Sequence, residues 1–264
     1  PEQFGIYSIL FAAATTFGFI YDPGLTTLVL KKFSSTRKYF GLVPQFVTIK
    51  IVVLAIAGIF FFLVVSLGLT PGSGLIEAAA MFALVALNEM TVILFSVLRA
   101  QDYTQREVLL RLFHGITTIA SLYALFFFEA DLLKVLFAQL VPTVCVLPFI
   151  AIQLKTLFPD QRKSRKQNIT HAIFRRLQGI FWFQCVVVIW STVELLLAAQ
   201  LFDSEKVGTY GAAQRLFLLA QLPSAVLATV LLPHLGATGG DSKTTAQNLW
   251  LRLGKPFCLC LLLS

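Results

Sequence analysis

Basic connections alternate with uncharged or mixed connections between the long apolar runs of this chain, and this pattern constrains the fold more than any other feature. Each full run holds the roughly 20 residues that a helix needs to cross the hydrocarbon core of a bilayer, at about 1.5 Å per residue. The pattern therefore predicts an all-α protein that crosses a membrane several times. The runs lie at about 4–30, 42–69, 75–98, 107–128, 132–154, 173–202, 206–235 and 245–264.

The charges of the connections predict the side of the membrane on which each connection lies. Lys and Arg residues are retained on the cytoplasmic side of membrane proteins. By contrast with the basic connections, the connection 70–74 carries no charge. We therefore expect the first residues to lie outside and four connections to lie inside, namely 31–40, 99–106, 155–172 and 236–246.

The composition excludes a water-soluble enzyme. The chain is 57% hydrophobic, with a mean hydropathy of +0.81 and 25 Phe among its 264 residues. A soluble domain of this length cannot cover so much apolar surface. The net charge of +8 lies mostly in the inside connections, so we attribute it to orientation and to attraction for anionic lipid rather than to nucleic-acid binding.

No catalytic, nucleotide-binding or metal-binding pattern is found, so we expect no cofactor and no catalytic activity. There is no P-loop to take energy directly from ATP. The four Cys residues fall inside apolar runs and are interpreted as small core residues. The three His residues are scattered along the chain, without ligand spacing. These residues are Cys145, Cys185, Cys258 and Cys260, and His114, His171 and His234.

A short motif occurs twice. The pattern E-x-[FV]-G-x-Y-[SG] begins at Glu2 and again at Glu205, so its two copies are residues 2–8 and 205–211. Six runs separate the two copies, so both copies begin on the same side. This is typical of a transporter made of two six-helix halves related by an axis along the membrane normal. The chain begins without Met and stops inside an apolar run, so we expect at least one helix before Pro1 and several after Ser264.

Several motifs, in this order and spacing, are similar to those of the polysaccharide flippases, the Wzx-like oligosaccharide exporters. They are Phe4-Gly5-Ile6-Tyr7-Ser8, Asp22-Pro23-Gly24-Leu25-Thr26, Leu98-Arg99-Ala100, Ile189-Trp190-Ser191-Thr192-Val193-Glu194-Leu195-Leu196-Leu197, and Val207-Gly208-Thr209-Tyr210-Gly211-Ala212-Ala213-Gln214-Arg215-Leu216 running on to Leu231-Leu232-Pro233. The family usually has Asp where Glu194 stands, which keeps the charge and changes its reach.

The resemblance implies membership of the superfamily that includes MATE drug exporters and lipid II flippases, with these helices as the second to the ninth. It implies a first lobe at 1–155, a basic cytoplasmic linker at 156–171 and the start of a second lobe at 172–264, around a central cavity. It further implies that an undecaprenyl-diphosphate-linked oligosaccharide crosses the bacterial cytoplasmic membrane by alternating access. A polysaccharide polymerase and glycosyltransferases would then be partners of the protein.

Ionisable residues inside the apolar runs are the candidate site residues of the first lobe. An ionisable group at the bilayer centre needs a partner or a wet cavity. Asp22 and Lys50 lie at similar depth in one hairpin, so a salt bridge between them is possible. We expect a polar belt in the cytoplasmic half, formed by Asp22, Lys50, Glu89, Arg111 and His114. Two alternatives stay open: Lys50 and Arg111 snorkel to the headgroups, and Asp22 belongs to an Asp-Pro-Gly turn that ends the helix.

The second lobe offers a further set of candidates nearer the outside. Glu194 and Arg215 lie at similar depth in one hairpin, either lining the cavity, where Arg215 meets a diphosphate, or forming a structural ion pair. The amides of Gln184, Gln214 and Gln221 are interpreted as sugar-binding groups or as hydrogen-bonding contacts between helices.

Two other functions stay open. A cation-coupled drug exporter needs a carboxylate-rich pocket, which Asp22 and Glu89 permit and which Lys50 and Arg215 argue against. A membrane-embedded glycosyltransferase or polymerase needs a catalytic group in a long external loop, and the external loops here are short.

Overall fold

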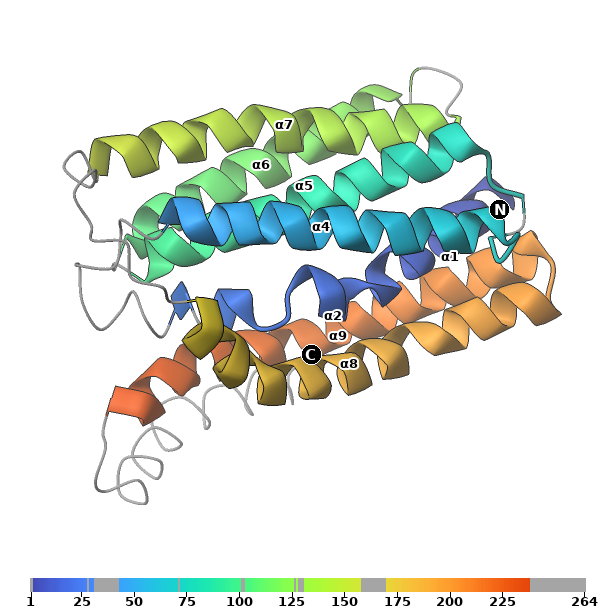
Figure 1. Cartoon of the computed structure of the whole chain (residues 1–264). Helices are drawn as coiled ribbons and strands as arrows, with labels where there is room; N and C mark the ends of the chain where they lie inside the picture. The colour runs from blue at the N-terminus through green and yellow to red at the C-terminus, as the bar shows by residue number, and fades with distance from the viewer. Residues whose placement is uncertain are drawn as a thin grey trace, which may run out of the picture. The chain divides into compact units, whose positions relative to one another are not determined.

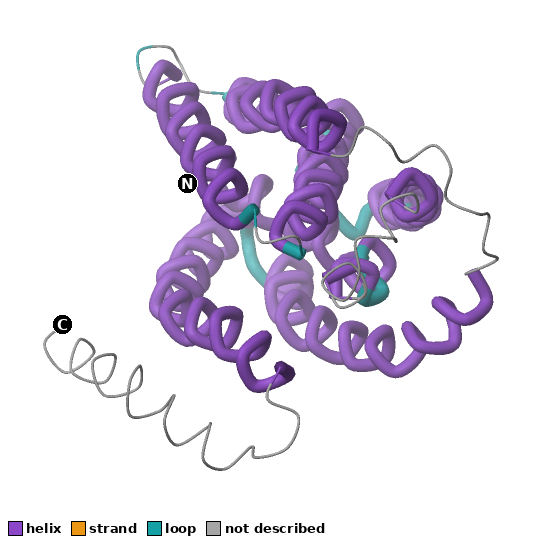
Figure 2. The backbone as a smooth tube through the Cα atoms, turned by 90° about the vertical axis from the view of Figure 1, so that its left-hand side faces the viewer, coloured by secondary structure: helices purple, strands orange, loops and turns teal. Residues whose placement is uncertain are grey.

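The computed structural model describes residues 2–27, 29–30, 43–70, 72–100, 103–125, 127, 131–157 and 170–237. Within the helices, it describes the backbone alone at 19, 157, 170–180, 184, 191 and 221–237. The described residues form helices and short connections without a strand, as Figures 1 and 2 show. The helices are α1 Glu2–Thr16, α2 Gly18–Tyr21, α4 Val43–Ser66, α5 Leu75–Arg99, α6 Thr104–Leu125, α7 Leu132–Leu157, α8 Thr170–Leu201 and α9 Ser204–Ala237.

The first apolar run is not one helix, which corrects the expectation of a single span at 4–30. The helix is interrupted between α1 and α2 and ends again at Asp22. Pro23 disfavours a helical conformation for the residue before it, and Asp22 has φ −131° and ψ 77°. Gly24 follows with φ 89°, in the left-handed region that favours glycine. The Asp-Pro-Gly sequence therefore turns the chain, as its residue types predict.

The remaining runs that the structure describes are helices close to their expected bounds, and the run at 245–264 lies outside the described residues. Five helices are long and apolar enough to cross a membrane, over Val43–Ser66, Leu75–Arg99, Thr104–Leu125, Leu132–Thr156 and Phe181–Leu201 of the described chain. The helix α7 continues through Pro142 and Pro148. The neighbouring helices of a membrane protein can satisfy the carbonyls that a proline leaves free.

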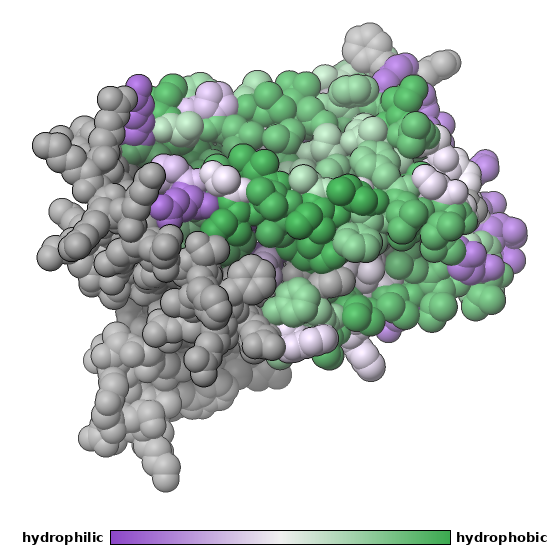
Figure 3. All heavy atoms as spheres, viewed as in Figure 1, coloured by the Kyte–Doolittle hydropathy of each residue, from purple (hydrophilic) through white to green (hydrophobic). Residues whose placement is uncertain are grey.

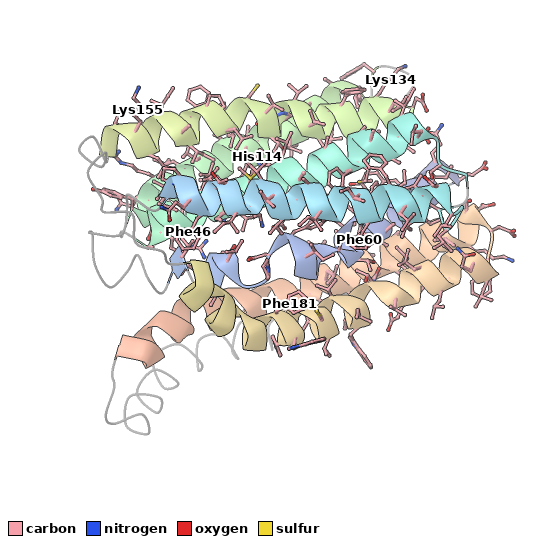
Figure 4. The ribbon with its side chains drawn as sticks, viewed as in Figure 1. Phe46, Phe60, His114, Lys134, Lys155 and Phe181 are labelled. Carbon is pink, nitrogen blue, oxygen red and sulfur yellow. The ribbon has the colours of Figure 1, made fainter. Side chains whose placement is uncertain are left out.

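From α4 to α8, successive helices run in opposite directions, so helix ends that border connections expected on the same side of the membrane lie together (Figure 1). Lys134 and Lys155 mark the two ends of α7 in Figure 4. At the end expected outside, the side-chain amide of Gln200 donates to the carbonyl of Leu69 at 3.1 Å. At the other end, Phe46, Val97 and Leu154 pack in one cluster.

The centre of the bundle is α5, which packs against α7 and α4. Its residue Met81 is fully buried in a cluster with residues of α1, α2, α4 and α7. The rings of Phe61 and Phe82 stack at a centroid distance of 5.5 Å. A Cβ atom at Gly58 would lie 2.8 Å from the ring of Phe82, so the glycine permits α4 and α5 to approach closely.

The outward faces of the helices are apolar. Leu109 and Ile116 on α6, Phe149 on α7 and Trp190 on α8 are among the exposed large hydrophobic residues. Figure 3 shows a continuous apolar surface along the helices, with hydrophilic residues toward their ends. Such a surface is stable in contact with lipid and not in water. The protein is therefore an all-α, multi-pass membrane protein.

The chain divides into two compact units, Pro1–Gly211 and Ala212–Ser264, and α9 crosses the boundary between them. The expected linker 156–171 lies almost entirely outside the described residues. The division into lobes at 1–155 and 172–264 stays a prediction.

Candidate functional site

A buried ion pair joins α4 to α5. Lys50 Nζ lies 2.7 Å from Glu89 Oε2, and the side-chain exposures are 0% for Lys50 and 27% for Glu89. Lys50 is seven residues after the start of α4, and Glu89 is ten residues before the end of α5, which places them about 10 and 15 Å from the helix ends. A lysine so enclosed needs a carboxylate partner. Both residues were predicted, and Lys50 does not snorkel to the headgroups.

The salt bridge that the sequence permits between Asp22 and Lys50 is not formed among the described residues. A carboxylate oxygen of Asp22 accepts a hydrogen bond from the backbone N–H of Thr26 at 3.0 Å. Asp22 thus caps the helical turn that follows the Asp-Pro-Gly break, as Asp commonly does at a helix start. Because the break changes the course of the chain, counting residues along a continuous helix misjudged the position of Asp22. Within the described chain, Lys50 pairs with Glu89 instead.

Arg111 belongs to a second ionic cluster, at the junction of α5 and α6. Its Nε donates to Glu107 Oε1 at 2.8 Å. Arg99 holds the same carboxylate in a two-point contact, from Nε to Oε2 at 3.0 Å and from Nη2 to Oε1 at 2.5 Å. Glu107 is only 2% exposed. The sequence interpretation missed Glu107, although the spacing of four residues between Glu107 and Arg111 places both on one helix face.

His114 lies in a chain of polar contacts between α6, α7 and α1 (His114 is labelled in Figure 4). Its Nε2 lies 3.0 Å from Thr143 Oγ1, and that hydroxyl donates to the carbonyl of Gln139 at 3.0 Å. This arrangement requires the tautomer of His114 that carries its proton on Nε2. Tyr7 donates to the side-chain oxygen of Gln139 at 3.1 Å. The residues of the expected polar belt therefore form separate hydrogen bonds and ion pairs rather than one connected network.

The candidates of the second lobe are placed only in part. The hydroxyl of Tyr210, in the first turns of α9, donates to Glu194 Oε2 at 2.8 Å. Gln214 and Arg215 are half-buried on α9 beyond the boundary of the first compact unit. The pairing of Arg215 with Glu194 stays a prediction. The side chains of Gln184 and Gln221 lie outside the described residues.

The two copies of the repeated motif are in contact. A Cβ atom at Gly5 of α1 would overlap the backbone carbonyl of Ser204, where α9 begins. A Cβ atom at Gly211 would lie 2.8 Å from Ser8 Oγ and 3.0 Å from Ser8 Cβ. Ser8 is buried, and its hydroxyl has no hydrogen-bond partner among the described residues. The missing side chains at Gly5 and Gly211 thus permit α1 and α9 to meet at the end expected outside.

The described residues hold no group of three or more His, Cys, Asp or Glu side chains that could bind a metal ion. They contain instead ion pairs inside a membrane-crossing helix bundle. Such groups are found where polar substrates or ions cross membranes, and also where they join helices.

Comparison with known proteins identifies the family. The sequence model of the polysaccharide biosynthesis protein family matches residues 1–238, most of the chain. No curated protein and no solved structure matches it. The match agrees with the resemblance carried by the motifs and with the apolar, multi-helix fold. The chain is thus a membrane transporter of polysaccharide biosynthesis and belongs to the polysaccharide biosynthesis protein family.

Proposed function

We propose that this protein flips an undecaprenyl-diphosphate-linked oligosaccharide across the bacterial cytoplasmic membrane by alternating access. The substrate has a charged diphosphate, polar sugars and an apolar tail. A cavity with cationic and amide groups would hold the diphosphate and sugars, while the tail stays in the bilayer. Arg215 and the amides of Gln184, Gln214 and Gln221 are the groups we propose for this role. The step moves the substrate without breaking a covalent bond, so the protein is not an enzyme.

The contact between the starts of α1 and α9 is the observation that carries this proposal. Alternating access requires two related parts that meet on one side of the membrane and separate in the other state. The two motif copies meet here through Gly5, Ser8 and Gly211. The buried hydroxyl of Ser8 lacks a partner in this state, and it would be hydrated once the helices separate. The contact therefore has the properties expected of a closed outer gate.

A disulfide across the contact tests whether separation is needed. The Cβ atom of Ser8 would lie 3.0 Å from a Cβ atom at Gly211. A disulfide needs about 3.5–4.5 Å between these atoms, so the bridge can form once the two helix starts move apart by about 0.5–1 Å. The full-length protein carrying Ser8→Cys and Gly211→Cys, in a background with the native cysteines replaced by Ser, is expressed in cells that lack the gene. We expect surface polysaccharide to fall several-fold under oxidising conditions and to recover with a reductant.

The single variants Ser8→Cys and Gly211→Cys are the matched controls, since neither can form the bridge. Surface polysaccharide that persists after complete cross-linking would refute the gate. Normal surface polysaccharide in cells without the gene would refute the flippase assignment itself. Accumulation of the lipid-linked sugar at the inner leaflet of the cross-linked cells would identify the blocked step as export.

The rival function of a cation-coupled drug exporter is less well supported. It needs carboxylates that can bind a cationic drug. Glu89 already neutralises Lys50, and Asp22 caps a helical turn. Neither carboxylate is left to form a negatively charged pocket, so we retain the flippase proposal.

A further inference from the structure

The ionic cluster at the α5–α6 junction has more positive than negative charge. Two guanidinium groups, of Arg99 and Arg111, share the single carboxylate of Glu107. The whole segment 99–111 has the same imbalance, with three Arg residues against two acidic residues. One carboxylate cannot neutralise two guanidinium groups, so the cluster can accept a further anion.

Arg111 is the member that is open to such an anion. Its side chain is 46% exposed. Only Nε is used for Glu107, and the guanidinium lies over the ring of Phe95, 4.5 Å from the centroid. Within the described chain, its two Nη groups form no hydrogen bond or ion pair. The contacts with Glu107 and Phe95 hold the guanidinium in one orientation, which prepares its free edge for a two-point contact with a phosphate.

The cluster lies at the boundary between the headgroup layer, which holds the lipid phosphates, and the hydrocarbon core, within reach of the long arginine side chain. Glu107 is three residues and Arg111 seven residues into α6, which starts at Thr104; these are about 5 and 10 Å along the helix. The polar headgroup layer is about 5–8 Å thick on each side of the hydrocarbon core. Beside Arg111, the apolar residues Val108 and Leu112 are exposed, as expected for a helix face in contact with acyl chains.

We propose that Arg111, positioned by Glu107 and Phe95 and supported by the charge of Arg99, binds the phosphate group of an anionic membrane lipid at the cytoplasmic surface. The lipid is either an anionic phospholipid or the lipid diphosphate that the transporter carries, because both present phosphate oxygens beside an apolar tail. This places Arg111 at the lipid-facing edge rather than in a central cavity. Binding of an anionic phospholipid requires only the membrane topology, whereas binding of the lipid diphosphate rests on the proposed flippase function.

Native mass spectrometry of the purified full-length protein in detergent tests the site. Phosphatidylglycerol, zwitterionic phosphatidylcholine and undecaprenyl diphosphate are added in separate titrations. We expect at least one of the two anionic lipids to bind about tenfold more tightly than phosphatidylcholine, as one charge-assisted contact of about 1.4 kcal/mol implies. Arg111→Ala should remove this difference. The fold should survive, because Arg99 still holds Glu107.

Two further variants separate a built site from general surface charge. Arg111→Lys keeps the charge and loses the forked contact, so we expect about threefold weaker binding. Lys155→Ala removes an exposed charge near the same end of the bundle, on α7, and should leave binding unchanged. The proposal fails if Arg111→Ala binds like the wild type, or if Lys155→Ala weakens binding equally. Preference for phosphatidylglycerol or for undecaprenyl diphosphate identifies the source of the phosphate.

Discussion

The two ionic clusters of this transporter differ in burial and in charge balance. The Lys50–Glu89 pair is one-to-one, and the lysine is fully enclosed between α4 and α5. In the second cluster, two half-exposed arginines share the buried carboxylate of Glu107. The first is neutral and enclosed by the bundle, whereas the second carries excess positive charge and its arginines are half-exposed.

The difference shows that a helix bundle tolerates unbalanced charge only where water or lipid headgroups can reach it. A charge removed from water needs a partner of opposite charge at hydrogen-bonding distance. Near the headgroups, lipid phosphates and water can balance an excess charge. We therefore expect the enclosed pair to contribute more to stability and the exposed cluster to interact with lipid.

The largest expected effect is the loss of the partner of Lys50. Glu89→Ala leaves a fully buried ammonium group without a counter-ion, so we expect a destabilisation of about 3–5 kcal/mol. Lys50→Ala should destabilise less, because Glu89 keeps 27% of its side chain exposed and water can reach the remaining charge. Thermal unfolding of the full-length protein in detergent measures both effects.

The double variant Lys50→Met/Glu89→Leu is the control for this comparison. Replacing both charges with apolar groups of similar volume removes the buried charge altogether, so most of the lost stability should return. If the double variant is as unstable as Glu89→Ala, the loss comes from packing rather than from an unpaired charge.

The next effect distinguishes the two arginines of the exposed cluster. Arg99→Ala removes the two-point contact with Glu107 and leaves one bond from Arg111, so we expect a loss of about 1–2 kcal/mol after allowing for solvent screening. Arg111→Ala removes one bond and should lower stability by less than about 1 kcal/mol. Melting temperatures of both variants and of the double variant measure the coupling between them. Equal losses would show that Glu107 does not prefer Arg99.

The smallest effect is expected where a charge pair is fully open to water. Lys206 Nζ lies 3.8 Å from Asp203 Oδ2, and both side chains are exposed. Such a pair contributes little, because water and salt screen it. Lys206→Ala should leave the melting temperature unchanged within error. A clear decrease would mean that screening at this end of the bundle is weaker than its exposure implies.

The helices and their directions were predictable from the sequence, because hydropathy and loop charge report directly on contact with lipid and water. The bounds of α4, α5 and α7 follow the apolar runs closely. The break after the first helix was also encoded locally, in Asp22-Pro23-Gly24.

The partners of the charged residues were less predictable, because they depend on contacts between helices. From their expected depth in the membrane, Asp22 and Glu89 were equally suitable as the ion-pair partner of Lys50. Only the packing of α4 against α5 selects Glu89. Glu107 stood four residues before Arg111, a spacing that indicates a shared face. Its second partner, Arg99, lies across a connection whose course the sequence does not encode.

Ser8 and Gly211 occupy the same place in the two copies of the repeated motif, since each lies six residues after its glutamate, Glu2 or Glu205. These two equivalent positions touch each other directly. At such a point, enlarging one position crowds the equivalent position directly, with no neighbouring groove to receive the added atoms. The sizes of these two side chains are therefore limited jointly, and a bulkier residue at either position moves the two helix starts apart.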